Sequence, residues 1–301
     1  MQQTKKKKTG KYLGYTSYGV LITLVFLVYR FPSDILTSYI ETRVNKNASQ
    51  YRFIIQDIRP SFPTALNFMK SEVILNTNSN TSSFKVDRLI VKPDLFSLIQ
   101  GRFRYLLDCK AYKGSIKGYL EFLNNNFKAP FSTAFDIINI KLEKNPLFGQ
   151  LIGADLIGDL AGDISFDASP KAMIDSSGIF NLRFTDGNLD LVKPVFSIDV
   201  IKFDELIISI ELKKRSIEIT KFILKGPEIN GSLIGTIYLR NNFSKSRLNL
   251  EGDISPLIDI TRGSKRDVNT LRFYKQFLEK ENFSFRIHGT IKAPKFKPIL
   301  S

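Results

Sequence analysis

The sequence predicts a mainly β protein, in which an N-terminal transmembrane helix is followed by an elongated antiparallel β domain with a few short amphipathic helices. Three observations support this fold class: an uncharged stretch directly after a lysine cluster, alternation of apolar and polar residues over most of the remaining chain, and an internal repeat. Cys109 is the only cysteine in the 301 residues, so no intrachain disulfide can form. The β domain therefore depends on its apolar core for stability.

The first element is a membrane anchor predicted over Tyr12 to Tyr29, after a basic tail that covers residues 1–11. Its 18 residues would span about 27 Å as a helix, close to the thickness of the hydrocarbon core of a bilayer. The lysines on one flank keep that flank in the cytoplasm, which places residues 30–301 across the membrane. The anchor residues singled out are Tyr12, Val20, Leu21, Ile22, Leu24, Val25, Phe26, Leu27, Val28 and Tyr29.

Two alternatives to an anchor start from the same residues. A cleaved signal peptide would end in small residues, whereas Tyr29-Arg30-Phe31-Pro32 follows here. A buried helix of a soluble protein would present a charged face to solvent, and the stretch from Tyr12 to Tyr29 contains no charged residue. Both features favour a retained anchor.

Strand-like alternation is clearest near the C-terminus, where Phe283, Phe285 and Ile287 alternate with polar residues. Such a segment is typical of a strand with one apolar face and one solvated face. A second signal lies at residues 185–188, where Asp-Gly between two apolar runs predicts the tight turn of a β-hairpin. The sequence therefore indicates antiparallel strands joined by short turns.

An acidic array in the middle of the chain has two interpretations. Asp155, Asp159, Asp163 and Asp167 recur every four residues, a spacing that on a helix would form a carboxylate stripe for a hard cation. Apolar residues and glycines fill the positions of opposite parity, and this favours a strand with an acidic, solvated face. Acids four residues apart on a strand are about 13 Å apart, too far to share one ion, so we expect no metal site.

Residues 114–127 and 231–243 form an imperfect repeat, in which Gly114-Ser-Ile-Lys-Gly118 aligns with Gly231-Ser-Leu-Ile-Gly235. We interpret it as the trace of two related β-meanders, around residues 66–127 and 180–243, with chance similarity as the alternative.

Three short amphipathic helices are predicted beside the strands. The first begins at Phe31-Pro32 and ends at about Val44. A second follows Asn145-Pro146, and a third runs from Asp267 to Glu281. The first helix would carry its apolar side chains on one side, at Ile35, Leu36, Tyr39 and Ile40.

The sequence contains little that could support catalysis. His288 is the only histidine, and its place on the polar side of a strand pattern favours a surface side chain over a general base or a metal ligand. No phosphate-binding loop, nucleophile elbow or zinc-protease motif occurs. Residues 1–30 carry +6 of the net charge of +15, and the remaining +9 is dispersed, without the compact basic patch that nucleic-acid binding needs. We therefore expect no enzyme, no cofactor and no nucleic-acid partner.

Several segments in a fixed order together resemble a known family. They are the basic tail and span, Phe31-Pro32 opening a helix, Asp57-Ile-Arg-Pro-Ser-Phe-Pro63, Val91-Lys-Pro-Asp-Leu-Phe-Ser-Leu-Ile-Gln-Gly101, the two Gly-x-[IL]-x-Gly strands and Ile287-His-Gly-Thr-Ile-Lys-Ala-Pro-Lys-Phe296. In this combination the chain, over most of its length, resembles the bacterial type II secretion system protein N family, in the form similar to AsmA-like periplasmic proteins. The motifs are structural glycines and prolines, and they bring no catalytic residues with them.

The resemblance implies a single-pass protein of the Gram-negative inner membrane, with a cytoplasmic N-terminus and a periplasmic β domain. One hypothesis is a structural or assembly component of a type II secretion system, which contacts other secretion subunits through strand edges or loops. The other is an AsmA-like groove that binds or transfers phospholipid, lined by Leu156, Leu160, Ile164, Phe166, Phe285 and Ile287. For these six residues a closed β-sandwich core is the alternative.

Overall fold

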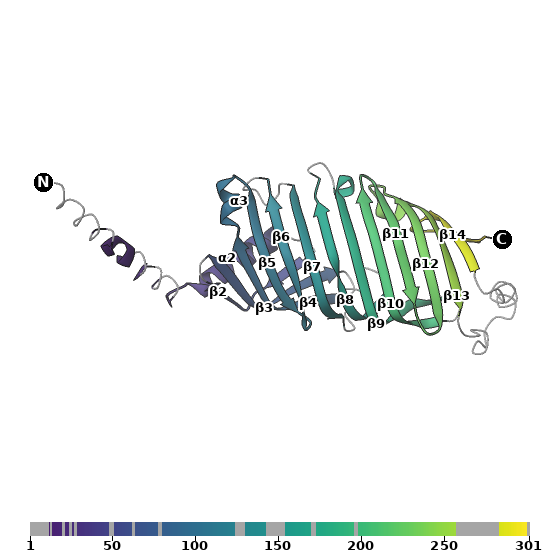
Figure 1. The fold of residues 1–301 in the computed structure, drawn as a ribbon, viewed down its shortest axis with the longest axis horizontal. Coiled ribbons are helices and arrows are strands. Elements are labelled where there is room, and N and C mark those ends of the chain that lie inside the picture. The colour runs from purple at the N-terminus through teal and green to yellow at the C-terminus, as the bar shows by residue number, and fades with distance from the viewer. Residues whose placement is uncertain are drawn as a thin grey trace.

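The computed structural model describes residues 12, 14–19, 22–23, 26, 29–47, 51–61, 64–77, 80–123, 130–142, 154–169, 173–195, 198–256 and 283–299. Within them the chain forms one antiparallel sheet of fifteen strands, and the longer helices stand at its N-terminal end (Figure 1). The prediction of a mainly β fold is confirmed. The helices predicted after Asn145-Pro146 and over residues 267–281 lie outside the described residues.

The elements occur in a simple order along the chain. The helical elements are α2 (Ser33–Asn47), α3 (Leu95–Ile99) and the short 3-10 helices η1 (Met173–Asp175) and η2 (Phe243–Lys245). The strands are β1 (Tyr51–Ile54), β2 (Asp57–Ser61), β3 (Ala65–Thr77), β4 (Asn80–Pro93), β5 (Phe103–Ala111), β6 (Gly114–Phe122), β7 (Phe131–Leu142), β8 (Ala154–Asp167), β9 (Ser177–Val195), β10 (Ile198–Lys213), β11 (Ser216–Lys225), β12 (Ile229–Tyr238), β13 (Arg247–Pro256), β14 (Phe283–Thr290) and β15 (Pro294–Pro298).

The sheet is a meander in which every strand from β3 to β14 pairs with the strand that follows it, while β1 and β2 both pair with β3. In Figure 1 the strands therefore stand side by side in chain order, from the purple end to the yellow end. Antiparallel neighbours need only short connections, so the sheet can grow by adding one hairpin at a time.

Both copies of the predicted repeat lie in this one sheet, the first in β6 and the second in β12. The second glycine of each copy, Gly118 in β6 and Gly235 in β12, lies in close contact with the backbone of the strand that follows. A Cβ on Gly118 would lie 1.9 Å from the carbonyl oxygen of Ala134, and one on Gly235 would lie 2.3 Å from that of Asn249. The glycines are thus required by close strand contact, whatever the origin of the repeat.

A line of irregularities, which we call the crease, crosses the middle of the sheet. The ladder register shifts between Ile137 and Ile140 in β7, between Ile157 and Asp159 in β8, and within β11. Bulges bend a strand and increase its twist, so a row of them folds the sheet toward its apolar face. The main core gathers at this fold, and its buried members are Ile137, Ile140, Leu142, Leu156, Leu160, Phe184, Phe203, Leu206 and Leu224.

The hairpin predicted at residues 185–188 is wrong. β9 continues from Ser177 to Val195 through this segment, and Asp186 adopts the expected positive φ of 51° inside the strand. Gly187 then packs directly against β10, because a Cβ there would lie 2.5 Å from the ring of Phe203. The Asp-Gly pair therefore contributes a bend at the crease, and the chain reverses direction elsewhere.

Helix α2 confirms the helix predicted from Phe31, and the predicted apolar side is only partly packed. Leu36 and Ile40 are partly buried, whereas Ile35 and Tyr39 are exposed. Polar side chains of the helix also bond the first strands. Asn45 bonds the backbone N–H and carbonyl of Phe53, and a Glu41 oxygen accepts a hydrogen bond from the N–H of Ile55 at 2.6 Å. The helix thus satisfies backbone groups at the open edge of the sheet, which would otherwise remain available for pairing.

Helix α3 was not foreseen from the sequence, although its start signal is present. The Asp94 carboxylate caps the helix by accepting hydrogen bonds from the N–H groups of Phe96 and Ser97. The Ser97 hydroxyl also donates to this carboxylate at 2.7 Å, and these hydrogen bonds lower the pKa of Asp94. A glycine with positive φ, Gly101, follows the helix directly before β5.

The predicted anchor is described only in part. Tyr12, Ile22, Phe26 and Tyr29 are helical, whereas the other residues singled out for the anchor, namely Val20, Leu21, Leu24, Val25, Leu27 and Val28, lie outside the described residues. No helix in the described part of the chain combines the length and the apolar character needed to cross a membrane. The anchor over residues 12–29 is therefore not confirmed and stays a prediction.

Candidate ligand-binding face of the sheet

The pairing register brings one residue from each of fourteen neighbouring strands into a single line across the sheet, which we call the central row. Residues paired in an antiparallel ladder project to the same face, so the members of the row share one side of the sheet. Every member is apolar or glycine. From β2 to β15 they are Pro60, Leu66, Val91, Leu107, Gly118, Phe135, Ile164, Phe180, Ile210, Ile219, Gly235, Leu250, Ile287 and Phe296.

A second row lies two residues further along each strand and has the same character. Thr133 is its one small hydroxyl residue, and the hydroxyl donates a hydrogen bond to the carbonyl of Tyr119 at 2.6 Å. The row is Pro93, Tyr105, Leu120, Thr133, Phe166, Gly178, Leu212, Ile217, Ile237, Leu248, Gly289 and Pro294. Together the two rows define what we call the apolar face.

Away from the crease, most residues of the apolar face are only partly buried by the described part of the chain. In the central row Leu250 is buried, whereas Phe135, Ile164, Phe180 and Ile210 keep part of their surface in contact with solvent. Side chains beneath a second protein layer would be almost fully buried, as those at the crease are. The described residues thus leave a long strip of half-exposed apolar surface.

The opposite side, which we call the charged face, carries polar residues that are paired across strands. Glu205 accepts bonds from Arg183 at 2.8 Å and from Lys225 at 2.9 Å, and this arrangement lowers the pKa of its carboxyl. Arg104 similarly bonds Glu121 on the neighbouring strand. Exposed apolar residues such as Leu106, Ile179 and Ile234 also lie on this face, but its charged groups distinguish it from the two apolar rows.

The structure places the six residues predicted to line a groove on the apolar side of the sheet. It divides them into two groups by burial. Leu156, Leu160 and Phe285 are only 3%, 9% and 7% exposed, so they belong to packed cores. Ile164, Phe166 and Ile287 remain partly exposed. Three of the six residues are therefore buried and three stay partly exposed, and the groove itself stays a prediction.

An aromatic stack closes the C-terminal end of the apolar face. The rings of Phe285 and Phe296 stack with centroids 5.0 Å apart, and Phe283 stacks on both. Phe296 comes from the edge strand β15 and is 42% exposed. Stacked rings bury large apolar areas, so this cluster covers apolar surface at the end of the sheet.

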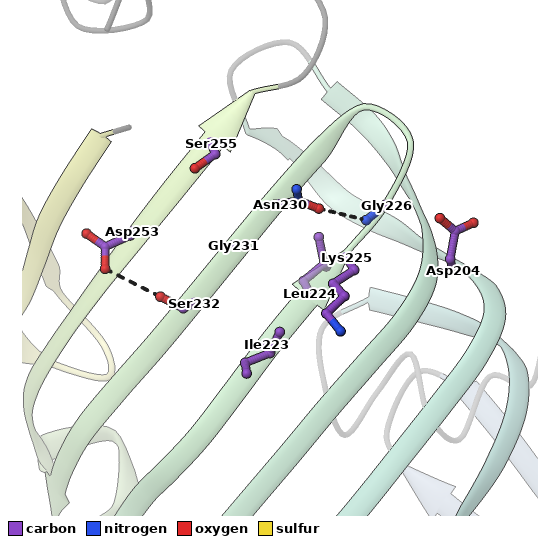
Figure 2. A pocket seen from close by; sticks show the side chains of 10 residues that line it. All are labelled: Asp204, Ile223, Leu224, Lys225, Gly226, Asn230, Gly231, Ser232, Asp253 and Ser255. Carbon is purple, nitrogen blue, oxygen red and sulfur yellow. Dashed lines mark hydrogen bonds between the residues drawn. The ribbon is translucent and has the colours of Figure 1, made fainter. Parts of the chain in front are cut away.

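A shallow hollow of about 480 Å³ lies between β10, β11, β12 and β13, near the ends of these strands (Figure 2). Its polar groups are occupied with one another. The Asn230 carbonyl oxygen accepts from the N–H of Gly226 at 3.2 Å, the Ser232 hydroxyl donates to Asp253 at 3.4 Å, and Lys225 is held by Glu205. These interactions hold the polar side chains of the hollow to one another.

The remaining sequence candidates for chemistry are placed as ordinary strand residues. The four aspartates of the acidic array lie on β8, as predicted, and no group of metal-ligating side chains occurs among the described residues. His288 lies on the charged face, paired in register with Asn249 and Lys295. Burial raises the pKa of the Cys109 thiol to about 11, with smaller effects from the charges of Asp108 and Asp87, so the thiol is a poor nucleophile.

Comparisons with known proteins add no identification: no family model, no curated protein and no solved structure matches the chain. The resemblance to the secretion protein N family thus stays a prediction.

Most of the apolar face was missed in the sequence. Leu107, Phe135, Phe180, Ile210 and Ile219 belong to it, and each lies in an alternating segment whose period was visible. Alternation alone could have marked these residues as apolar-side positions. Only the pairing register shows that they form one line.

Proposed function

We propose that the protein is a membrane-anchored lipid-binding protein of the cell envelope, which holds acyl chains along the apolar face of its sheet. The observation that carries this proposal is the central row, which crosses fourteen strands without a polar side chain and is half-exposed over much of its length. A sheet with one apolar side must cover it with a second layer or with a ligand. Acyl chains are the ligand class that matches a long strip without hydrogen-bonding groups.

The length of the central row supports a lipid over a compact small molecule. Thirteen steps between neighbouring strands, at about 4.8 Å each, give a path of about 60 Å along the sheet. That path is about twice the thickness of the hydrocarbon core of a bilayer. Several acyl chains, or one lipid at successive positions, would fit along it.

The proposal includes the topology expected from the sequence, with residues 1–11 in the cytoplasm, residues 12–29 in the inner membrane and residues 30–301 in the periplasm. An anchor would keep the apolar face close to the bilayer that supplies its lipid. A reporter that is active only outside the cytoplasm, fused after Ser301, should be active. Release of a shortened, freely soluble product would instead identify residues 12–29 as a signal peptide.

The hypothesis of a structural component of a secretion system stays a prediction. The two edges of the sheet do not favour the strand-edge contacts that it expects. Among the described residues β15 is the last strand of the sheet, and its sequence is Pro294-Lys-Phe-Lys-Pro298. Prolines and lysines on an edge oppose the addition of a further strand, because proline lacks the N–H group and lysine resists burial. The first edge is occupied by α2. Neither end of the sheet therefore favours docking by strand addition.

The test of lipid binding compares two isoleucines on opposite faces. Ile210 lies in the central row on β10, whereas Ile234 lies on the charged face of β12 and is 55% exposed. The full chain, purified in mild detergent, should carry phospholipid detectable by mass spectrometry and bind a fluorescent fatty-acyl probe. Ile210→Glu should weaken probe binding by at least about tenfold, because the carboxylate interrupts the apolar strip. Ile234→Glu should leave it unchanged.

Two results would contradict the proposal. One is that the purified protein contains no lipid and does not bind the acyl probe. The other is equal probe binding by the Ile210→Glu and Ile234→Glu variants, when circular dichroism shows both to be folded. In the second case the probe would be bound elsewhere on the protein.

A further inference from the structure

A second hollow, of about 630 Å³, lies at the end of the sheet where three chain connections meet. The β10–β11 turn contributes Arg215, and the β12–β13 loop with η2 contributes Arg240, Asn241, Asn242 and Lys245. Arg247 at the start of β13 completes the cationic lining, next to the β14–β15 turn. We call it the basic hollow.

Hydrogen bonds between the three connections fix the walls of the basic hollow. Ser246 is fully buried; its hydroxyl accepts a bond from the N–H of Arg240 at 3.0 Å, and its carbonyl accepts from the N–H of Ile291 at 3.0 Å. The carbonyl of Arg215 accepts from the N–H of Leu239 at 2.7 Å. The cations are thus attached to a connected backbone framework, which reduces the conformational entropy lost when they bind a ligand.

The charge of the basic hollow is not compensated by its own lining. Four cationic side chains line it and no carboxylate does. Arg215 donates to Asp175 at 2.9 Å, outside the lining, whereas Arg240, Lys245 and Arg247 form no ion pair within the described part of the chain. Like charges gathered around one hollow repel one another, and an anion at the centre would reverse that repulsion.

We propose that the basic hollow binds a phosphate-type anion, either the headgroup of an anionic lipid or a free phosphate ester. Arginine presents N–H groups in a planar fork that matches phosphate oxygens, and the Asn241 and Asn242 side chains can add uncharged polar contacts. The site is separate from the apolar face. Arg247 is paired in register with Tyr238 and Thr290, on the charged side of the sheet. Headgroup binding here and acyl-chain binding on the apolar face can therefore succeed or fail independently.

The test removes two cations from the hollow and compares an equal loss of charge elsewhere. The variant is Arg240→Gln with Arg247→Gln, and the control is Lys110→Gln with Lys221→Gln, two exposed lysines of other strands. Inorganic phosphate and water-soluble dihexanoylphosphatidylglycerol are titrated calorimetrically into the full chain in neutral detergent, at about 0.15 M salt to screen non-specific attraction. Binding should weaken by at least about tenfold in the arginine variant and by less than about twofold in the control.

The two probes distinguish the source of the anion. Binding of inorganic phosphate that depends on the two arginines supports the site and shows that free phosphate is sufficient. Arginine-dependent binding of the lipid analogue alone also supports the site and assigns it to a headgroup. Absence of binding by both probes, or equal weakening in the arginine variant and the lysine control, would overturn the proposal.

Discussion

The crease and the central row carry the same alternation of apolar residues, yet one is buried and the other is half-exposed. Leu206 and Ile210 make the contrast within one strand, since both project to the apolar side of β10. Leu206 is 3% exposed and belongs to the core, whereas Ile210 keeps part of its surface open. Leu206 packs within the core that gathers at the crease, whereas Ile210 lies outside that core. Alternation therefore decides which side a residue faces, and strand curvature decides whether that side is closed.

The largest expected effect tests this contrast directly. Phe203→Ala should lower the free energy of unfolding by about 3–5 kcal/mol, because it leaves a cavity in the core at the crease. Ile210→Ala should cost less, about 1–2 kcal/mol, since part of its side chain is already exposed and that part has no buried area to lose. Urea unfolding of the two variants measures both values. Equal losses would show that the central row is as well covered as the crease.

A second, smaller change in stability is expected when two glycines of the same strand, β12, are replaced by alanine. Gly235→Ala should cost about 1–3 kcal/mol, because Gly235 has φ 135° and a Cβ would lie 2.3 Å from the carbonyl oxygen of Asn249. Gly231→Ala should be neutral or slightly stabilising, since its Cβ would meet nothing closer than 3.6 Å and alanine restricts the unfolded chain. Thermal unfolding distinguishes them. A similar loss at both positions would mean that β12 tolerates no side chain at its glycines, whatever the local space.

The smallest effect uses Cys109, which lies on the apolar side of β5 and is partly buried. Burial raises the pKa of its thiol from 9.0 to about 11. The unfolded chain therefore releases this proton at lower pH than the folded chain, and the corresponding stability is present below pH 9 and lost as pH rises toward 11. The stability of the native protein should fall relative to Cys109→Ala over this window. A constant difference between the two proteins from pH 8 to 11 would show that the thiol is open to solvent.

Local patterns in the sequence predicted several elements correctly. β8 is a strand with its aspartates on the opposite parity to Leu160 and Ile164, and β14 contains the alternating segment that begins at Phe283. The helix from Phe31 was also predicted, within a few residues of α2. These predictions succeeded because alternation, proline and capping residues act over a few residues of chain.

The sequence predictions failed where one local pattern is compatible with more than one structure. The positive φ of Asp186 is compatible with a hairpin turn and with a bulge. In the structure Gly187 packs against Phe203 on β10, and the segment forms a bulge within β9. The packed side of α2 was predicted only in part for a related reason. Leu36 and Ile40 are partly buried as expected, but Glu41 and Asn45 also bond backbone groups of Ile55 and Phe53, which apolar periodicity does not predict.

The sequence by itself determined that the chain makes strands and which residues project to each side of them, because side-chain direction in a strand follows from a period of two. Only the tertiary structure decided that Pro60, Ile164 and Phe296, far apart in the chain, belong to one row. It also decided that Leu160 is buried while Ile164, which packs against the same core, stays partly exposed. The physical reason is that register and curvature depend on the pairing of every strand with its neighbours, and no single segment contains that information.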